Sequence, residues 1–425
     1  MSLLIISYPF GSVLGGGSKR AFYVLKEFIK KIDVKVFVPF RAILEVYLLS
    51  RKNSKILPIT LKNLKYLEKK GVEFFPQTFE YLENERLVEF FFNKFLQNKF
   101  DLFTYLINLD YFEKVYLEKH KIEEEKFEFI YTPHETFEFI YTTYLFSKKL
   151  NLKCSFLFQA EPFFRISHFY RLFKFRKVNT LISYFLGRKS KEILSKMIKE
   201  NRINKIILVS LAPKILSGFK FQNTKVLTPA NAFDKKLLKY RKFKKENYLV
   251  FFARLVPEKG IYEIPIVARK LKEVGFKEKI LIFGNFPNKE IEKNFYKLVE
   301  KNKVDDIIEL KGFDEKTLYK YVSKAKALIY PSHQDSFSLV VLETLALGTS
   351  VVAYNIPAII SVYRNLKPVK IVREGNIEQM VSELLNILNQ DDGKYLEEHM
   401  SINNFLELHS SWKKVAEAEL NELFS

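Results

Sequence analysis

The stretch ALIYPSHQDSFSLVVLETLALGTSVVAYNIP, residues 327–357, decides the fold. Its apolar start, residues 327–330, predicts a short buried strand that the following Pro-Ser pair would end. A loop, residues 333–337, comes next, and Ser336 or Ser338 could cap a helix that runs through Glu343 to Leu347 and ends at Gly348. A second apolar run, residues 351–353, begins another strand. This order of strand, helix and strand predicts one βαβ unit of a parallel sheet.

Two carboxylates lie where such a unit would bind a ligand. Asp335 is in the loop, and Glu343 is about one turn into the helix, so both could face the carboxyl end of the strand. A helix N-terminus favours phosphate, and an ionised carboxylate accepts hydrogen bonds from a ribose diol. The alternative is structural: Asp335, Ser336 or Ser338 would cap the helix, and Glu343 would be solvated.

The stretch resembles the E-x7-E segment of the retaining, family-4-type glycosyltransferases of the GT-B fold (glycosyl transferases group 1). The family pattern is PS-x-x-E-G-F-G-L-x-x-L-E-A-x-A-x-G-x-P-V-V. Here Asp335 replaces the first Glu, Ser336 and Ser338 replace two glycines, and Ser350 replaces the proline. The resemblance implies that Asp335 holds hydroxyls of the donor sugar and that Glu343 holds the ribose. It also implies that the helix start binds the donor through Ser336, Phe337, Ser338 and Leu339.

Composition sets the broad class. The chain has 425 residues, of which 48% are hydrophobic and 28% charged, as expected for a globular protein of two domains. One cysteine, Cys154, excludes an internal disulfide and fits a reducing compartment. Residues 1–10 lack signal-peptide features, and no apolar run approaches the roughly 20 residues of a membrane span. We therefore expect a cytoplasmic protein, soluble or attached to the cytoplasmic face of a membrane.

The formal net charge of +21 favours anionic partners. Nucleic acid, anionic lipid and phosphorylated substrates all fit that charge, but no nucleic-acid-binding motif is present, and we expect no such partner. Residues 163–191 contain eight Lys and Arg and no Asp or Glu, with apolar residues at helical spacing. This segment is either a basic amphipathic helix on an anionic membrane surface or an ordinary domain helix with a solvated basic face.

The first half of the chain offers weaker signals. A strand at residues 3–7 precedes a glycine-rich loop, residues 11–17, which is either a plain turn or a ligand contact. The resemblance implies that Gly16 and Gly17 belong to the family's GG motif at the cleft between the domains. It also makes His134, which follows a predicted strand, a catalytic candidate, although a lone histidine is more often structural. Many family members place a histidine where this chain has Gln159 and Glu161.

The second half opens with a clearer pattern. Residues 225–234, KVLTPANAFD, resemble the family's I-P-N-G-V-D turn and would end the first domain, and the basic residues 235–245 would be a linker. The segment ARLVPEKG after the next strand resembles G-R-L-x-x-x-K-G. Arg254 and Lys259 are thus the expected diphosphate ligands, since guanidinium and ammonium groups bind phosphate. The alternative is two solvated cations.

Together these patterns predict an α/β chain of the GT-B fold, with two Rossmann-like domains facing a cleft. Residues 1–234 would bind the acceptor, residues 235–410 the donor, and a terminal helix, residues 411–425, would cross back onto the first domain.

The resemblance implies a retaining, metal-independent hexosyltransferase that moves a sugar from a UDP- or GDP-sugar to an acceptor hydroxyl in glycan or glycolipid biosynthesis. The acceptor would be a glycan or lipid-linked, and no cofactor is expected. The catalytic candidates are Arg254, Lys259, Asp335 and His134. A nucleotide-sugar epimerase and a non-catalytic basic binding protein on the same fold remain alternatives.

Overall fold

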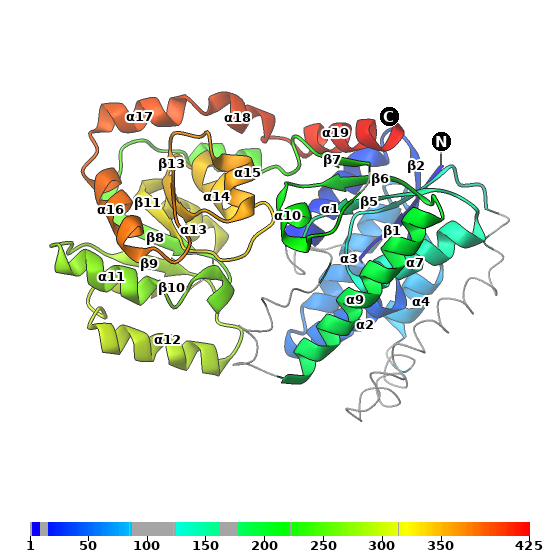
Figure 1. Cartoon of the computed structure of the whole chain (residues 1–425), viewed down its shortest axis with the longest axis horizontal. Helices are drawn as coiled ribbons and strands as arrows, with labels where there is room; N and C mark the ends of the chain where they lie inside the picture. The colour runs from blue at the N-terminus through cyan, green and yellow to red at the C-terminus, as the bar shows by residue number, and fades with distance from the viewer. Residues whose placement is uncertain are drawn as a thin grey trace. The chain divides into compact units, whose positions relative to one another are not determined.

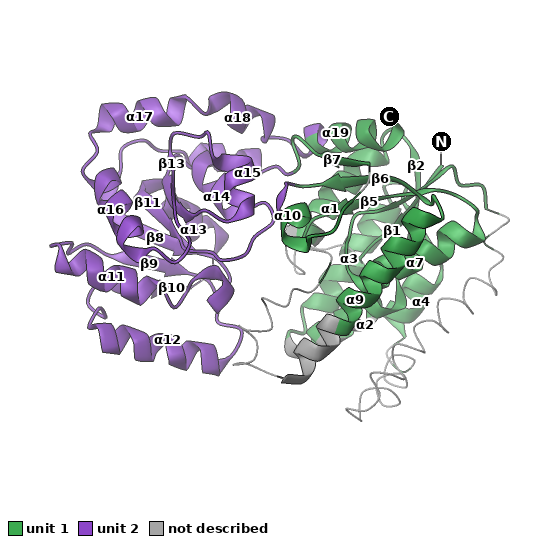
Figure 2. Cartoon of the chain, in the orientation of Figure 1, with its two compact units in different colours: residues 1–209, 213–230, 415–425 green, residues 210–212, 231–414 purple. Residues whose placement is uncertain are grey.

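The computed structural model describes residues 2–8, 16–84, 125–160, 177–221, 223–312 and 314–425, and residues 86, 122 and 163 between them. The chain divides into two units (Figure 2). The first comprises residues 1–209, 213–230 and 415–425, and the second comprises residues 210–212 and 231–414. Each contains one parallel sheet flanked by helices, as Figure 1 shows. The predicted α/β class with two Rossmann-like domains is confirmed.

The described residues of the first unit form a sheet of order β3-β2-β1-β4-β5-β6-β7, in which every pair is parallel. Its strands are β1 (Ser2–Ile6), β2 (Asp33–Phe37), β3 (Glu73–Phe74), β4 (Phe129–Thr132), β5 (Cys154–Phe158), β6 (Ile203–Leu208) and β7 (Thr224–Val226). Its helices are α1 (Gly16–Phe28), α2 (Phe40–Lys52), α3 (Ile56–Glu68), α4 (Gln77–Glu83), α7 (Phe137–Lys149), α9 (Lys177–Lys199), α10 (Ala212–Ser217) and α19 (Trp412–Phe424). Cys154 is free and buried at the start of β5.

A buried polar network fastens the terminal helix α19 within the first unit. The Nε of Arg20 in α1 donates to the carbonyl of Ala230 at 2.8 Å, and its Nη2 forms an ion pair with Glu419. The hydroxyl of Tyr131 in β4 donates to Glu419 Oε1 at 2.5 Å. Since Arg20 and Glu419 are fully buried, the pair joins α1 and α19 across 399 positions of sequence.

The second unit contains a sheet of order β10-β9-β8-β11-β12-β13, again parallel throughout. Its strands are β8 (Glu246–Phe252), β9 (Ile280–Phe283), β10 (Ile308–Lys311), β11 (Ala325–Tyr330), β12 (Ser350–Tyr354) and β13 (Val369–Val372). Its helices are α11 (Ile264–Glu273), α12 (Lys289–Asn302), α13 (Glu315–Lys324), α14 (Leu339–Ala346), α15 (Pro357–Tyr363), α16 (Ile377–Leu388), α17 (Asp392–Met400) and α18 (Asn403–Leu408). The predicted βαβ unit is β11, α14 and β12.

Close backbone packing organises the carboxyl edge of this second sheet. Gly260, after β8, has φ +80°, and a Cβ there would lie 2.2 Å from the carbonyl oxygen of Pro331, after β11. Gly284, after β9, has φ +147°, and its Cβ would lie 2.3 Å from the carbonyl oxygen of Ala253. Only glycine fits either position, so the loops after β8, β9 and β11 are held against one another.

The basic segment 235–245 is not a linker, as the sequence had suggested, but part of the second unit. It begins with a 3-10 helix, Lys235–Tyr240, whose Leu237 is buried. Lys245 Nζ donates to the carbonyl of Ser323 near the end of α13 at 2.7 Å, and Arg241 Nη2 donates to that of His399 near the end of α17 at 3.2 Å. Both cations thus meet the negative end of a helix dipole, which compensates charges that lack a carboxylate partner.

No helix in the described part of the chain is both long and apolar enough to cross a membrane.

Candidate functional site

Asp335, in the loop after β11, is surrounded by donors. Its Oδ2 accepts from the hydroxyl of Tyr330 at 2.5 Å and from Lys259 Nζ at 2.7 Å. Its Oδ1 accepts from the amides of Ser336 at 2.8 Å and Ser338 at 3.1 Å. A carboxylate has about four acceptor sites, so these contacts occupy the group fully. In this conformation Asp335 shapes the loop, and any contact with a sugar hydroxyl would require one of these bonds to be shared.

The same contacts keep Asp335 ionised. Burial by itself would raise the pKa of Asp335, but the charge of Lys259 and the hydrogen bonds outweigh it and hold the pKa below its ordinary value. The neighbouring Tyr330 shows the opposite shift, because burial and the charge of Asp335 raise its pKa well above the ordinary range. The loop after β11 therefore contains a negative charge that is paired with Lys259 of the loop after β8.

The start of α14 differs from the predicted serine cap. The N-cap residue is Ser338, but its hydroxyl makes no capping bond, and Asp335 supplies the acceptor for the Ser338 amide. Ser338 has φ +67° and ψ +64°, a left-handed conformation that glycine adopts more easily. Two amides of the first turn, those of Leu339 and Val340, have no acceptor in the part of the chain that the structure describes. Such a helix N-terminus favours an anion.

The two predicted phosphate ligands, Arg254 and Lys259, have different environments. Lys259 ends a 3-10 turn, Pro257–Lys259, and donates to Asp335 and, at 2.8 Å, to the carbonyl of Gln334. Two of its three donors therefore hold the loop after β11. Arg254 follows β8 and is exposed, and its guanidinium has no hydrogen-bond or ion-pair partner among the described residues. Arg254 is thus the cation that remains available for a phosphate.

The other predicted ligand residues of the second unit differ in accessibility. Glu343 is half-buried in α14, and its charge adds to burial in raising the pKa of Tyr319 on α13. Phe337 is buried, with its ring centroid 6.0 Å from that of Tyr363 and 5.7 Å from that of His409. Phe337 is therefore a packing residue, and only its backbone could contact a ligand. Leu339 is half-buried.

In the first unit, His134 has the contacts of a core histidine. It lies after β4, is buried, and has Nε2 3.0 Å from the hydroxyl oxygen of Ser7. Its ring centroid is 4.9 Å from that of Tyr8 and 4.8 Å from that of Phe139. Burial, together with the charge of Arg20, lowers its pKa to about 3. The ring is therefore neutral at physiological pH, and its predicted catalytic role would be limited to hydrogen bonding.

Gly17 lies against Gln159, a partly buried residue of a second group of polar side chains. α1 begins at Gly16, and a Cβ on Gly17 would lie 3.2 Å from Oε1 of Gln159, after β5. Gln159 Nε2 donates to the carbonyl of Pro133 at 2.6 Å, and the Gln159 amide donates to Glu135 Oε2 at 2.9 Å. The segments that follow β4 and β5 thus contact one another and the start of α1. Glycines 11 and 15 and Glu161 lie outside the described residues.

Sequence reasoning did not identify Glu135, which has an unusual environment. It is 9% exposed, and burial outweighs its hydrogen bonds from backbone amides, raising its pKa to about 7. Its position directly after a predicted strand was a usable signal, because polar residues at the carboxyl ends of parallel strands often line a site.

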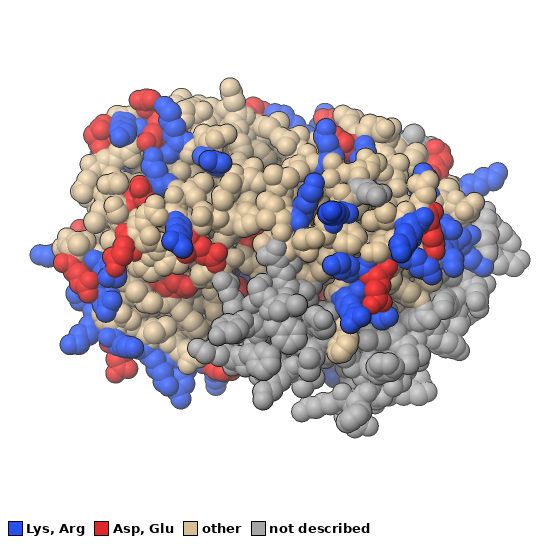
Figure 3. Space-filling model, in the orientation of Figure 1, with Lys and Arg blue, Asp and Glu red and all other residues tan. Residues whose placement is uncertain are grey.

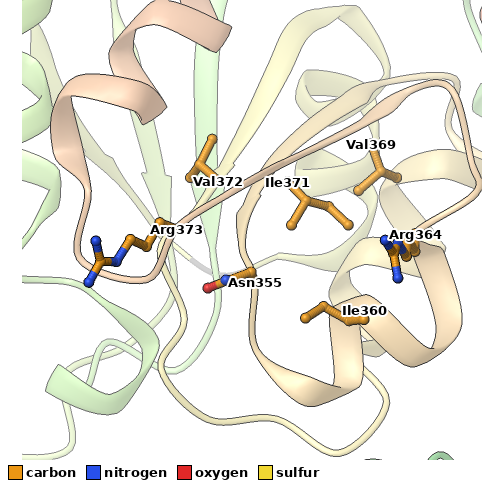
Figure 4. Close-up of a pocket in the computed structure, with 7 residues that line it drawn as sticks. All are labelled: Asn355, Ile360, Arg364, Val369, Ile371, Val372 and Arg373. Carbon is orange, nitrogen blue, oxygen red and sulfur yellow. The ribbon is translucent and has the colours of Figure 1, made fainter.

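A separate cavity of about 410 Å³ lies beside β12, β13 and α15 (Figure 4). It is lined by Asn355, Ile360, Arg364, Val369, Ile371, Val372 and Arg373. Figure 4 shows the two arginines at opposite ends, with Ile360 and Ile371 between them. None of the residues predicted from sequence lines this cavity.

The charges of the described surface are mixed. On the face shown in Figure 3, Lys and Arg of both units alternate with Asp and Glu, and no single basic stripe covers it. Within the described residues, no group of three or more His, Cys, Asp or Glu is placed to hold a metal ion. The expectation of metal-independent chemistry remains a prediction.

Comparison with known proteins finds a family match in the second unit, which contains Arg254, Lys259 and Asp335. Residues 233–405 match the family model of glycosyl transferases group 1, which confirms the resemblance for this region. The capsular polysaccharide biosynthesis glycosyltransferase CapM of Staphylococcus aureus is 22% identical over 205 residues, 48% of this chain and 50% of CapM. The match thus spans half the length of that curated relative.

Two solved structures extend the likeness to the whole chain. HepE from Anabaena, in complex with UDP, has a TM-score of 0.65 at 12% identity and covers 100% of both chains. TarM has a TM-score of 0.66 at 15% identity, covering 100% of this chain and 99% of TarM. At these identities the likeness shows the fold, which is the GT-B fold of glycosyltransferases.

Proposed function

We propose that this chain is a glycosyltransferase that moves a hexosyl group from a nucleotide-sugar donor to an acceptor hydroxyl. The observation that carries the proposal is at the carboxyl edge of the second sheet. There an exposed guanidinium, that of Arg254, follows β8 and has no partner among the described residues, and the amides of Leu339 and Val340 at the start of α14, which follows β11, have no acceptor among them either. Both are groups that bind phosphate oxygens, and both lie within the region that matches glycosyl transferases group 1.

The contacts and exposure of these side chains suggest a role for each. Arg254 would neutralise the charge that develops on the leaving diphosphate, which lowers the barrier to transfer. Lys259 would contribute its remaining donor and, through Asp335, hold the loop that presents the α14 amides. Glu343 would accept from the ribose hydroxyls. We propose retention of stereochemistry and transfer without a metal ion as part of the same mechanism.

We propose UDP as the donor nucleotide, because HepE, which covers the whole chain, was solved with UDP. GDP is the alternative that the experiment below tests. The acceptor would be a glycan or lipid-linked hydroxyl bound by the first unit, in the synthesis of a surface glycan, as the name of CapM suggests for that relative. Attachment to an anionic membrane through residues 163–191 is part of this proposal, although residues 164–176 and the side chains of residues 177–184 lie outside the described part.

The test is calorimetric binding of UDP, GDP and ADP, followed by assay of sugar transfer from the matching donors. Arg254→Ala should weaken binding of the preferred nucleotide about tenfold or more, since a charged hydrogen bond is lost. The matched control is Arg269→Ala, an exposed arginine of α11 that forms an ion pair with Glu273 one turn away, and it should bind like the wild type. If the wild type binds none of these nucleotides, the proposal is wrong. If it binds but catalyses no transfer, a binding protein or an epimerase becomes the better explanation.

A further inference from the structure

His333 lies between two carboxylates. It follows β11, two residues before Asp335. Its Nδ1 is 2.7 Å from Glu374 Oε1, and its Nε2 is 2.5 Å from Glu263 Oε1. Ionised carboxylates only accept hydrogen bonds, and a neutral imidazole has a single N–H. Only the doubly protonated ring, with one positive charge, donates to both glutamates.

The two glutamates are themselves held in place. Glu263 lies at the N-cap of α11, and the amide of Glu374, just after β13, donates to Asn355 Oδ1 at 2.8 Å. The amide of His333 donates to the carbonyl of Glu258, after β8, at 3.0 Å. His333 therefore joins the loop of residues 331–338 to fixed points next to three other elements of the sheet's carboxyl edge.

The surroundings favour a positive ring. The side chain of His333 is 16% exposed, and the ring centroid of Tyr354 lies 5.4 Å away. Burial and the charges of Glu263 and Glu374 raise the pKa of Tyr354, so this phenol is neutral and adds no charge. On the histidine's own loop, the charge of Asp335 is already paired with Lys259. Among the described residues, the two glutamates are the charged groups that contact the ring from the elements packed against it.

We propose that His333 is a positioning residue: as an imidazolium held between Glu263 and Glu374, it fixes the loop of residues 331–338 in the conformation that binds the donor nucleotide. This rests on the proposed function. The doubly protonated ring donates to both glutamates and thereby stabilises the bound conformation. When the ring loses one proton at higher pH, the lone pair of that nitrogen faces a carboxylate, so the loop is released and nucleotide affinity falls.

Substitution of one glutamate separates this mechanism from simple packing. In Glu374→Gln, the amide can donate to the unprotonated Nδ1 while Nε2–H still donates to Glu263, so both hydrogen bonds persist with a neutral ring. This variant should keep its affinity as the pH rises. His333→Ala loses both bonds and should bind weakly at every pH.

The experiment measures UDP affinity by calorimetry between about pH 5.5 and 8.5, the range in which histidines titrate. Wild-type affinity should fall about tenfold across this range, as expected for loss of one charged hydrogen bond, and that of Glu374→Gln should stay flat. Superimposable profiles for these two proteins would overturn the proposal, as would wild-type affinity in His333→Ala.

Hydrogen exchange of the amides of residues 331–338 distinguishes this proposal from the proposed function. Exchange in the wild type, measured against Glu374→Gln at each pH, should accelerate as the ring deprotonates. If exchange follows this course but neither the wild type nor the variants bind a nucleotide, His333 still fixes the loop, and its role in donor binding is overturned together with the proposed function. If UDP binds but exchange in the two proteins is identical at every pH, the proposed role of His333 is wrong and the proposed function is unaffected.

Discussion

The buried carboxyl of Glu135 allows a quantitative prediction about stability and pH. Its pKa rises from an ordinary value of 4.5 to about 7 on folding because of burial. Between these two values the folded state retains a proton that the unfolded state has lost. The free energy of unfolding therefore falls as pH rises through this window and is constant, for this group, on either side of it.

The size of the effect follows from the shift. About 2.5 pKa units at roughly 1.36 kcal/mol each correspond to about 3 kcal/mol of destabilisation above pH 7. Glu135→Gln removes the titrating group and keeps an oxygen that can accept from the amide of Gln159. The variant should therefore gain about 3 kcal/mol relative to the wild type between pH 4.5 and pH 8.

The assay is unfolding in urea at several pH values, followed by hydrogen exchange of the β4 and β5 amides, which reports on the first unit by itself. Taking the difference between variant and wild type cancels the titration of every other group. A difference for Glu135→Gln that stays within about 0.5 kcal/mol from pH 4.5 to 8.5 would refute the reasoning.

Three further predictions concern single residues. Glu419→Gln leaves Arg20 buried without its counter-charge and should cost about 3–5 kcal/mol in the free energy of unfolding of the first unit, measured in urea; a loss below about 1 kcal/mol would contradict the network. Ser338→Gly relieves a left-handed serine and should raise stability by about 1 kcal/mol without weakening UDP binding, measured by thermal unfolding and calorimetry. Glu343→Gln should weaken UDP binding by about 1–3 kcal/mol, the contribution of a charged acceptor, and equal affinity would exclude the ribose role.

The βαβ unit of the second sheet was predictable because its signals are local. Strand β11 ends in the apolar run of residues 327–330, which Pro331 directly follows, and β12 contains the apolar run of residues 351–353. Gly348 has φ +79°, and a Cβ there would lie 2.7 Å from the carbonyl oxygen of Lys242. The apolar runs, Pro331 and the glycine after the helix lie within a few positions of one another, so the sequence displays them directly, whereas the close approach of Gly348 to Lys242 appears only in the fold.

The side-chain pairs within the site were not predictable, because the residues that form each pair are distant in sequence. The sequence places Lys259 and Asp335 at separate motifs, yet they form an ion pair 2.7 Å long across 76 positions. His333 likewise binds Glu263 and Glu374, which lie 70 positions before it and 41 after it. Such pairings depend on which loops meet at the carboxyl edge, and that is set by strand order rather than by local pattern.

The net charge of the chain does not by itself identify a binding site. A formal +21 suggested an anionic partner, but several of the cations have structural partners. Lys245 donates to the carboxyl end of α13, Lys326 donates to the carbonyl of Gln390 just beyond α16 at 3.1 Å, and Lys259 is paired with Asp335. Net charge counts these residues equally with Arg254, which is exposed and without a partner among the described residues. We therefore propose that anion binding depends on the Arg254 guanidinium and on the open amides at the start of α14 rather than on net charge, and the comparison of Arg254→Ala with Arg269→Ala measures the contribution of Arg254 directly.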